Sequence, residues 1–298
     1  MRVLVTGGTG FIGRHLITHL LNETKHEVVL LLREPYSDPG LLTPELAKVR
    51  TQVTAVYADL RNFQLTARAV REAEAEAVIH LAAAGATDPF LGVETAVRHN
   101  LTGTVNLLRA CFEKSQHIQQ AIVARTPGEL SAMNVYAASK AASWNFCQMY
   151  AHTQGWPIHG AMIFQAYGPG QPGKTLVAAA VRAALAGQDF PMTAGTQQRD
   201  WIYASDVAAG LTALLGASLM PGATLDLGTG YLTSVADVVA QIYTLVGGNG
   251  RPLPGVLPSR PGEDAVQAAD AVQTKELTGW ETAVSLQKGL QLTLKGSE

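Results

Sequence analysis

A glycine-rich turn between the first strand and the first helix is the feature that most constrains this chain. Residues 6–13 read Thr-Gly-Gly-Thr-Gly-Phe-Ile-Gly and directly follow the apolar run Arg2–Thr6. In such a turn the first glycine permits a tight bend, the second lets the backbone approach a pyrophosphate, and the third allows close helix packing. The phosphates would meet free N–H groups at the positive end of the helix dipole. The turn therefore predicts dinucleotide binding, against the alternative of a glycine-rich turn without a ligand. The residues expected to contact the dinucleotide here are Gly7, Gly10, Phe11, Ile12 and Gly13.

Short apolar runs alternate with amphipathic stretches through the first half of the chain. Nearly continuous apolar runs are typical of parallel strands that are buried on both faces. This alternation predicts an α/β fold with a Rossmann-type, doubly wound parallel sheet. The expected strands are Arg2–Thr6, Val28–Leu32, Val53–Ala58, Ala77–Leu81, Gln120–Ala124 and Ile158–Gln165. The expected helices are Ile12–Leu21, Phe63–Ala75, Val93–Lys114 and Val135–Thr153.

The texture of the sequence changes after Ala166. Residues 167–173 are dense in glycine and proline, which indicates a loop or a domain junction. We expect a dinucleotide-binding domain over residues 1–166 and a smaller, mixed α/β substrate-binding region over residues 167–298. Within the second region we expect a helix at Thr175–Ala186, a strand near Trp201–Tyr203, and a further helix that Ser234 and Asp237 open as a capping box. Residues 200–216 or so are expected to pack back on the first domain.

Composition excludes several classes of protein. Of the 298 residues only 15% are charged, and the net charge is −2, so the chain has no basic stripe for a nucleic-acid backbone. No stretch approaches the roughly 20 apolar residues that a membrane span needs. The two cysteines, Cys111 and Cys147, are too far apart for a CxxC pair and are expected to be reduced and buried. We therefore expect a cytoplasmic protein without nucleic-acid or membrane partners.

The choice between NAD and NADP depends on the end of the second strand. An acidic residue there contacts the ribose hydroxyl of NAD, whereas an arginine accommodates the 2′-phosphate of NADP. Arg33 stands at this turn and favours NADP, while the adjacent Glu34 keeps NAD open. The ends of the third and fourth strands are also placed to contact the cofactor, through Asp59, Leu60, Leu81, Ala82 and Ala83.

Tyr136 and Lys140 are four residues apart, so that both side chains lie on one face of the predicted helix. A phenol has a pKa of about 10 and is a weak base at neutral pH. A nearby ammonium stabilises the phenolate and lowers that pKa, so that the tyrosine can exchange a proton while hydride moves to or from nicotinamide. Lys140 can also hold the nicotinamide ribose.

These motifs together resemble the extended short-chain dehydrogenase/reductases, the NAD-dependent epimerase/dehydratase family that acts mostly on nucleotide sugars. The resemblance covers nearly the whole chain. It rests on Thr6–Gly13, Asp59-Leu60, His80–Ala83, Asn100–Thr104, Tyr136–Lys140, Tyr167–Pro169, Arg199–Trp201 and Arg260–Gly262.

The resemblance implies roles for further residues. Thr126 matches the threonine that hydrogen-bonds the reacting oxygen, with Ser131 as its rival, and Asn100 matches a residue that fixes backbone geometry. Gln165 stands where the family commonly has an asparagine near the substrate phosphates. Two arginines match those that hold the substrate diphosphate, Arg199 and Arg260. The family's equivalents of the helices Val93–Lys114 and Val135–Thr153 form a dimer interface, so we expect a homodimer.

Two departures from the family pattern concern the reaction. The segment between Thr126 and Tyr136 is shorter than usual, and Pro127-Gly128 replaces the Asp-Glu pair of the dehydratases. Elimination of water needs such groups, so this replacement argues against dehydration. A metal site is not expected either, because His15 and His19 share a helix face but lack the glutamate of a metalloprotease motif.

The leading hypothesis is an NAD(P)-dependent epimerase or ketoreductase that acts on a nucleotide-activated sugar. Tyr136, Lys140 and Thr126 would form its catalytic group. One alternative is an NADPH-dependent reductase of a carbonyl compound that carries no nucleotide. Another is a catalytically idle protein that senses NADP or serves as a scaffold.

Overall fold

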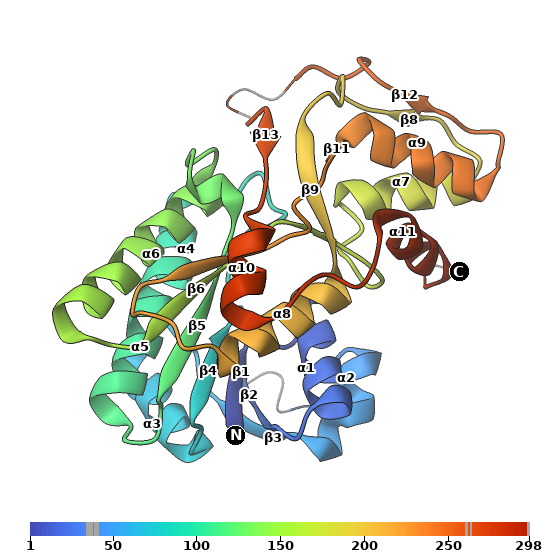
Figure 1. The fold of residues 1–298 in the computed structure, drawn as a ribbon. Helices are drawn as coiled ribbons and strands as arrows, with labels where there is room; N and C mark the ends of the chain where they lie inside the picture. The colour runs from blue at the N-terminus through green and yellow to red at the C-terminus, as the bar shows by residue number, and fades with distance from the viewer. Residues whose placement is uncertain (34–37, 39–41, 260–261, 263, 297–298) are drawn as a thin grey trace.

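A seven-stranded parallel sheet forms the centre of the protein, with helices on both of its faces (Figure 1). The computed structural model describes residues 1–296 except for 34–37, 39–41, 260–261 and 263. The strand order is β10-β6-β5-β4-β1-β2-β3, so the chain changes direction across the sheet between β1 and β4. Such a switch point opens a crevice at the carboxyl ends of the strands. The strands are β1 (Arg2–Thr6), β2 (Glu27–Leu32), β3 (Thr54–Tyr57), β4 (Ala77–His80), β5 (Gln120–Arg125), β6 (Ile158–Ile163) and β10 (Thr224–Leu227).

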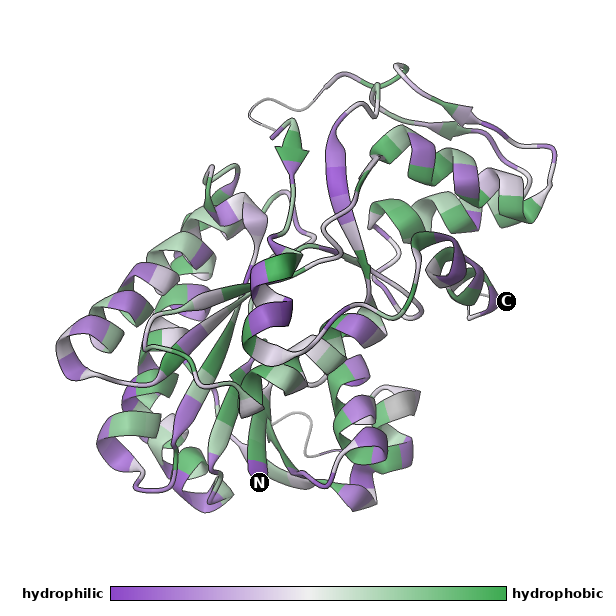
Figure 2. Cartoon of the chain, viewed as in Figure 1, coloured by the Kyte–Doolittle hydropathy of each residue, from purple (hydrophilic) through white to green (hydrophobic). Residues whose placement is uncertain are grey.

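Alternate residues of the strands pack against helices on opposite faces of the sheet. Val3 and Val5 pack with α1 (Phe11–Glu23) and α8 (Ala204–Gly216), whereas Leu4 packs with the helices of the other face. That second layer is formed by α3 (Phe63–Ala73), α5 (Gly103–Lys114) and α6 (Val135–Gln154). Apolar residues therefore fill the strands almost continuously, and hydropathy colouring shows this contrast with the mixed helices (Figure 2). Cys111 and Cys147 are free and buried in the second layer, as expected.

The long helix predicted at Val93–Lys114 is continuous but not uniform. It begins as α4 (Val93–Ala96), passes through a π-helical segment at Val97–Thr102, and continues as α5. Single π turns inside helices often occur at functional sites. Before the third strand, the chain also forms α2 (Pro44–Val49) and a 3₁₀ turn at Arg50–Gln52.

The remaining elements lie over the carboxyl ends of the central strands (Figure 1). Residues 158–165 do not form the single strand that was expected, because β6 stays in the central sheet and β7 (Gln165–Tyr167) pairs with β9 (Gln198–Tyr203) of a second sheet. That sheet also contains β11 (Leu232–Ser234) and β13 (Val266–Gln267), and β8 (Phe190–Pro191) pairs with β12 (Pro252–Leu253). This region has an apolar core of its own, separate from those on the two faces of the central sheet. It lies around the buried Tyr167 and is formed by α7 (Leu176–Leu185), α9 (Val235–Val246) and α11 (Leu286–Lys295). Ser234 caps α9 as predicted, because its Oγ accepts a hydrogen bond from the N–H of Asp237 at 3.0 Å.

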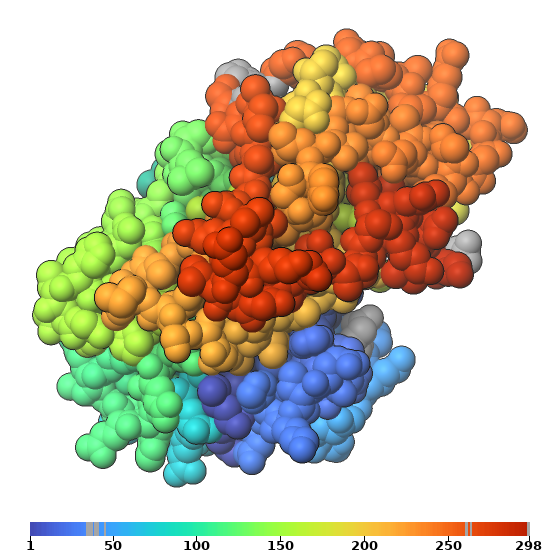
Figure 3. Space-filling view, viewed as in Figure 1, coloured from blue at the N-terminus to red at the C-terminus, as the bar shows by residue number. Residues whose placement is uncertain are grey.

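Residues 204–227 return from the second sheet to the first. Helix α8 packs against α1, and β10 pairs with β6 at the edge of the central sheet. The sequence did not predict β10, since its short alternating pattern Thr-Leu-Asp-Leu is weaker than the apolar runs of the other strands. Helix α10 (Ala271–Thr278) packs on β10 and α8, and the space-filling view shows these red residues against the front of the molecule (Figure 3).

Candidate active site

The turn after β1 has the close approaches that its glycines predict. Gly7 has φ 74°, and a Cβ at this position would lie 2.6 Å from the backbone N of Ala82. A Cβ at Gly13 would lie 2.3 Å from the carbonyl oxygen of Gly7. Gly10 occupies the N-cap of α1 without any side-chain cap, so the first helical N–H groups stay available to a ligand. Only glycine permits this packing of turn, helix and neighbouring strand.

A cavity of about 370 Å³ opens on this turn. Its lining contains most of the residues that were expected to contact the dinucleotide: Gly7, Gly10, Arg33, Asp59, Leu60, Leu81, Ala82 and Ala83. Phe11, Ile12 and Gly13 lie in the first turn of α1 and do not line it. The lining also includes residues that the sequence analysis missed: Thr6, Gly8, Thr9, Leu31, Leu32, Ala58, Arg61, Ala84 and His99. The glycine cradle and the uncapped helix fit a dinucleotide here.

Two arginines and a histidine line the cavity together with Asp59. Arg61 pairs with Asp59 through its guanidinium, and this pair holds the pKa of Asp59 down to about 2. Burial, Arg61 and Arg33 all lower the pKa of His99. Arg61 follows the predicted Asp59-Leu60 pair directly, but His99 comes from the π-helical segment, and only the fold brings it here.

An asparagine cap places the Tyr136–Lys140 pair at the start of α6. The Oδ1 of Asn134 accepts a hydrogen bond from the N–H of Ala137 at 2.8 Å, so the helix begins at Val135. Lys140 is only 4% exposed. Within the described part of the chain, neither its ammonium nor the Tyr136 hydroxyl has a hydrogen-bond partner. These two polar groups therefore remain available to a cofactor or substrate.

The pKa of Tyr136 moves opposite to the expected direction. Burial raises it to about 12, and the carboxylate of Glu129 adds to this rise. Burial lowers the pKa of Lys140, whereas Glu129 and Cys147 act to raise it. The two causes of the shift, burial and the charge of Glu129, both raise the pKa of Tyr136, and Lys140 is not among its causes.

Thr126 follows β5 directly and begins a short 3₁₀ turn, Pro127–Glu129. Its N–H donates a hydrogen bond to Oε1 of Glu129 at 3.0 Å, and its carbonyl oxygen accepts one from the N–H of Glu129 at 3.0 Å. Its rival Ser131 is exposed and donates to Oδ2 of Asp264 at 2.9 Å. This bond engages the Ser131 hydroxyl with the second region of the chain.

Asn100 has the structural role that the resemblance implies. It is buried, and its Oδ1 accepts a hydrogen bond from the N–H of Ala84 at 2.7 Å. Its Nδ2 donates to the carbonyl oxygen of Ala84 at 3.0 Å. Because Ala84 lines the cavity, Asn100 holds one wall of the cofactor site.

Two of the predicted substrate residues, Gln165 and Arg199, lie on neighbouring strands of the second sheet. Gln165 on β7 pairs in register with Trp201 of β9, two residues beyond Arg199. Arg199 is buried, and its Nη1 donates to the carbonyl oxygen of Gln198 at 2.9 Å. Arg260 lies outside the described residues, as does Glu34.

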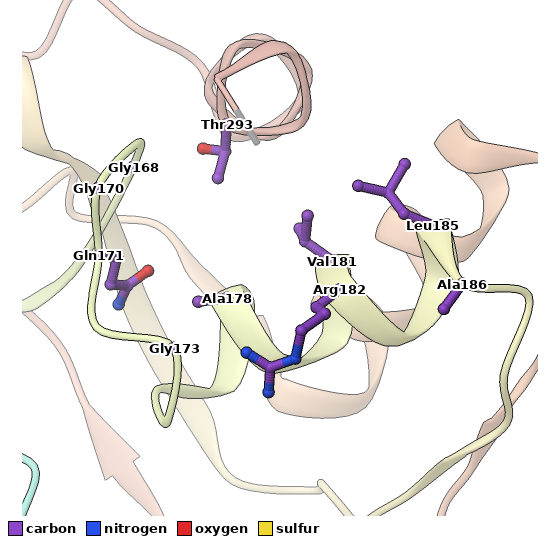
Figure 4. A pocket seen from close by; sticks show the side chains of 10 residues that line it. All are labelled: Gly168, Gly170, Gln171, Gly173, Ala178, Val181, Arg182, Leu185, Ala186 and Thr293. Carbon is purple, nitrogen blue, oxygen red and sulfur yellow. The ribbon is translucent and has the colours of Figure 1, made fainter. Parts of the chain in front are cut away.

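The larger cavity of about 510 Å³ lies elsewhere (Figure 4). It opens between the loop at residues 168–173, α7 and α11, with Gln171 and Arg182 among its lining side chains. Among the described residues, none of the site residues predicted from the sequence lines it.

The histidine pair on α1 does not form part of a metal cluster. The Nε2 of His15 lies 3.0 Å from the carbonyl oxygen of Pro169. Over residues 1–296, with their gaps, no three histidine, cysteine or acidic side chains gather as metal ligands. Among the same residues, no helix is long and apolar enough to cross a membrane.

Comparisons with known proteins identify the family. The model of the NAD dependent epimerase/dehydratase family matches residues 3–227. The Bacillus subtilis (strain 168) protein named as the uncharacterized UDP-glucose epimerase YtcB is 30% identical over 311 residues, which span 97% of this chain and 96% of that protein. A dTDP-glucose 4,6-dehydratase of Xanthomonas campestris pv. campestris (strain B100) is 27% identical over 325 residues, spanning 98% of this chain and 91% of that protein.

Solved structures agree over the same length. The Thermus thermophilus UDP-glucose 4-epimerase in complex with NAD has a TM-score of 0.83 and 28% identity, covering 100% of this chain and 99% of that one. The dTDP-glucose 4,6-dehydratase DesIV of Streptomyces venezuelae has a TM-score of 0.86 and 25% identity, covering 99% and 96%. The glycine cradle, the Tyr136–Lys140 helix and these matches together show that the chain belongs to the NAD-dependent epimerase/dehydratase family of extended short-chain dehydrogenase/reductases.

Proposed function

We propose that the protein is an NAD(P)-dependent epimerase or ketoreductase of a nucleotide-activated sugar. The observation that carries this proposal is the pair of unpartnered polar groups on α6, those of Tyr136 and Lys140, tied to the cofactor cavity within the described part of the chain. Asn100 connects the pair to the cavity through hydrogen bonds. Its side chain bonds both Ala84 in the cavity wall and Ser139, the residue before Lys140.

Each catalytic side chain has one task in this proposal. A bound nicotinamide supplies the hydride acceptor or donor. The Tyr136 hydroxyl exchanges the proton of the substrate oxygen, and Thr126 orients that oxygen. The buried Lys140 ammonium donates hydrogen bonds to the cofactor ribose. A pKa near 12 keeps Tyr136 protonated at neutral pH, so it is poised as an acid for carbonyl reduction.

Dehydration does not fit the residues after Thr126. Pro127 and Gly128 carry no acid or base. Glu129 is the nearest carboxylate after them, but Arg125 and the N–H of Thr126 occupy its two oxygens. This carboxylate is buried at the end of β5 and is not presented to a substrate.

The substrate class is proposed from Arg199 and Arg260, whose guanidinium groups suit a diphosphate. Several similar proteins support a nucleoside-diphosphate sugar: one solved relative is a UDP-glucose 4-epimerase, and another is a dTDP-glucose 4,6-dehydratase. An NADPH-dependent reductase of a carbonyl compound without a nucleotide is the second candidate, because the short segment between Thr126 and Tyr136 leaves out a usual substrate contact.

NADP is proposed as the preferred cofactor. Arg33 is exposed at the end of β2 and lines the cavity together with Arg61 and His99. The two arginines lie where the family binds the adenosine ribose, and their guanidinium groups would stabilise a 2′-phosphate.

A homodimer is proposed through α6 and the helix that begins at Val93. Four large apolar side chains are exposed on these helices: Val93, Val97, Phe146 and Met149. Exposed apolar side chains that recur on adjacent helices are typical of an interface between subunits.

Tyr136→Phe tests the proposed chemistry. The variant should lose turnover and keep cofactor binding, because the substitution removes only the hydroxyl. Thermal protection by NADPH measures binding, and absorbance of the reduced nicotinamide measures turnover over a panel of nucleoside-diphosphate sugars. Stoichiometric cofactor oxidation identifies a reductase, whereas product without net absorbance change identifies an epimerase.

Tyr150→Phe is the matched control, because Tyr150 lies on the same helix and stacks on Trp156 away from the pair. It should retain turnover.

A second experiment tests the substrate class. If UDP or dTDP raises the melting temperature of the wild-type protein and Arg199→Ala abolishes that rise, the result supports a nucleotide substrate. If neither nucleotide raises the melting temperature of the wild type, the result favours a reductase of a simpler carbonyl. If the wild-type protein binds the cofactor but turns over neither substrate class, both enzymatic hypotheses are contradicted. The remaining hypothesis is then a protein that senses NADP or serves as a scaffold.

A further inference from the structure

A buried ion pair, Arg125–Glu129, packs against α6, the helix that carries Tyr136 and Lys140. The carboxylate of Glu129 accepts a hydrogen bond from Nε of Arg125 at 2.9 Å, and the two side chains are 1% and 12% exposed. The guanidinium of Arg125 also stacks 4.5 Å from the ring of Trp144 on α6 and donates to Oγ1 of Thr224 at 3.0 Å. The pair is therefore clamped between β5, α6 and β10.

Burying such a pair is costly, because both charges lose their hydration. A cationic and an anionic side chain at the end of a core strand are therefore weak evidence for stability. Their position points to another role. Glu129 ends the turn that begins at Thr126, and both of its carboxylate oxygens are used, one by Arg125 and one by the N–H of Thr126.

We propose that Glu129 is a positioning residue of the reaction: its buried carboxylate holds the Thr126 turn in place and supplies the negative charge that the Tyr136–Lys140 pair experiences. This inference rests on the proposed function of that pair. The charge of Glu129 opposes ionisation of the Tyr136 phenol and favours the Lys140 ammonium, as its effect on the pKa of each group shows.

Among the described residues, no other titratable group near the pair raises the pKa of both members. Arg125 lowers the pKa of Lys140, and Cys147 raises the pKa of Lys140 but is not among the causes for Tyr136. His80 on β4 faces Lys140 but is held neutral, because burial and that lysine lower its pKa to about 3. Asp226 on β10 is influenced by Arg125. Glu129 is the group that acts on Tyr136 and Lys140 in the direction that keeps both protonated.

The test is a titration of Tyr136 that needs no substrate. The protein is labelled with tyrosine that carries ¹³C at Cζ, and the Tyr136 resonance is assigned from its loss in Tyr136→Phe. In E129Q the midpoint should fall by about one pH unit, the size expected for removing a charge at an intermediate dielectric. The amide oxygen of the new side chain can still accept from Thr126, so the turn is preserved.

Glu113→Gln is the matched control. Glu113 pairs with Arg109 at the same four-residue spacing, at 2.9 Å, but on the surface of α5. This variant should titrate like the wild type. Identical midpoints in E129Q and wild type would overturn the inference, whatever the enzyme's substrate proves to be.

Activity measurements distinguish the effect of the Glu129 charge on Tyr136 and Lys140 from its effect on the position of Thr126. In E129Q both limbs of the pH profile of kcat/KM should move to lower pH, because the pKa values of Tyr136 and Lys140 both fall. In Glu129→Ala the same shift should appear with an additional loss of kcat, because the N–H of Thr126 loses its acceptor. Equal kcat in the two variants would contradict the positioning of Thr126.

Should E129Q fail to fold, the double variant R125M/E129Q removes both charges and keeps the apolar contact with Trp144. Replacing a buried pair in this way is often neutral for stability. The Tyr136 midpoint should again fall by about one pH unit. A midpoint equal to that of the wild type would overturn the inference by the same criterion. Failure of the proposed function would appear instead as undiminished turnover in Tyr136→Phe.

Discussion

The side-chain amide of Asn100 donates a hydrogen bond to Oγ of Ser139 at 2.9 Å, and this contact joins the wall of the cavity at the glycine turn to α6. Ser139 precedes Lys140 and also donates to the carbonyl oxygen of Tyr136 at 2.7 Å. Asn100 holds Ala84 in the cavity wall through two further bonds. A buried asparagine from the π-helical segment thus links the cavity wall at Ala84 to the helix of the Tyr136–Lys140 pair.

Asn100→Ala should therefore lower both stability and turnover. The change removes three hydrogen bonds and leaves the N–H of Ala84 without an acceptor, which should cost about 2–4 kcal/mol in the free energy of unfolding. The kcat should fall more than KM rises, because the catalytic helix loses its alignment. Urea denaturation and steady-state kinetics measure the two effects.

Asn62→Ala is the control for this prediction. Asn62 caps α3 by accepting a hydrogen bond from the N–H of Leu65 at 3.1 Å, far from the pair along the sheet. Its loss should cost about 1 kcal/mol and leave kcat unchanged. An Asn100→Ala enzyme with wild-type kcat would disprove the alignment role.

The buried His80 predicts a pH dependence of stability. Its Nδ1 lies 2.6 Å from Oγ1 of Thr6 and its Nε2 2.9 Å from Oγ1 of Thr104, and its pKa falls to about 3. Between pH 6.5 and about 3 the unfolded chain binds a proton at this residue and the folded chain does not. Above pH 6.5 His80 is neutral in both states and does not reduce the free energy of unfolding. As the pH falls below 6.5, protonation of His80 in the unfolded chain lowers that free energy.

At pH 5 the loss from His80 alone should be about 2 kcal/mol. His80→Gln should flatten the dependence of the unfolding free energy on pH in this window by that amount. The exposed His117→Gln serves as the control and should follow the wild-type curve. Parallel curves for His80→Gln and wild type would show that His80 is not neutral in the folded protein.

Arg33→Ala should reduce the preference for NADP over NAD. A charge-assisted hydrogen bond contributes about 1.5–3 kcal/mol, so the ratio of the two dissociation constants should change by about tenfold or more. Isothermal titration calorimetry with each cofactor measures that ratio. The exposed Arg68→Ala on α3 is the control. A wild-type protein that binds NAD more tightly than NADP would contradict the proposed cofactor.

Phe146→Glu should convert the proposed homodimer to a monomer. Phe146 is 43% exposed on α6, and a carboxylate there would have to be buried between subunits. Light scattering during gel filtration measures the mass. Phe90→Glu is the control. Phe90 is 91% exposed but lies in the loop before α4, outside the two helices of the proposed interface, so this variant should remain a dimer. A wild-type protein that is monomeric, or a Phe146→Glu dimer, would refute this interface.

Much of the fold followed from local patterns. The strands β1 to β6 and the helices α1, α3 and α6 agree with the predicted ones to within two residues or so, apart from the strand that splits at Phe164. The chain leaves the central sheet and enters the second sheet at Phe164. The apolar pattern of the sequence continues through this point, so it does not reveal where one strand ends and the next begins. Strand β10 was missed because its place depends on pairing with β6, which no spacing in the sequence indicates.

The cofactor cavity was predicted in part. Residues next to strand ends, such as Asp59 and Ala82, were found because parallel strands end at one edge of the sheet. His99 was missed because it comes from a helix that passes the same edge. The roles of Gln165, Arg199 and Arg260 still rest on the resemblance, and Arg260 lies outside the described residues.

The sequence by itself determined the turn for a dinucleotide and the face shared by Tyr136 and Lys140, because both depend on spacings of a few residues. The tertiary structure alone decided the electrostatics of that pair. No motif in the sequence assigns a role to Arg125 or Glu129, yet the fold buries them as a pair, with Arg125 beside Trp144 and Thr224. Burial, which depends on elements far apart in the chain, is what raises the pKa of Tyr136 to about 12.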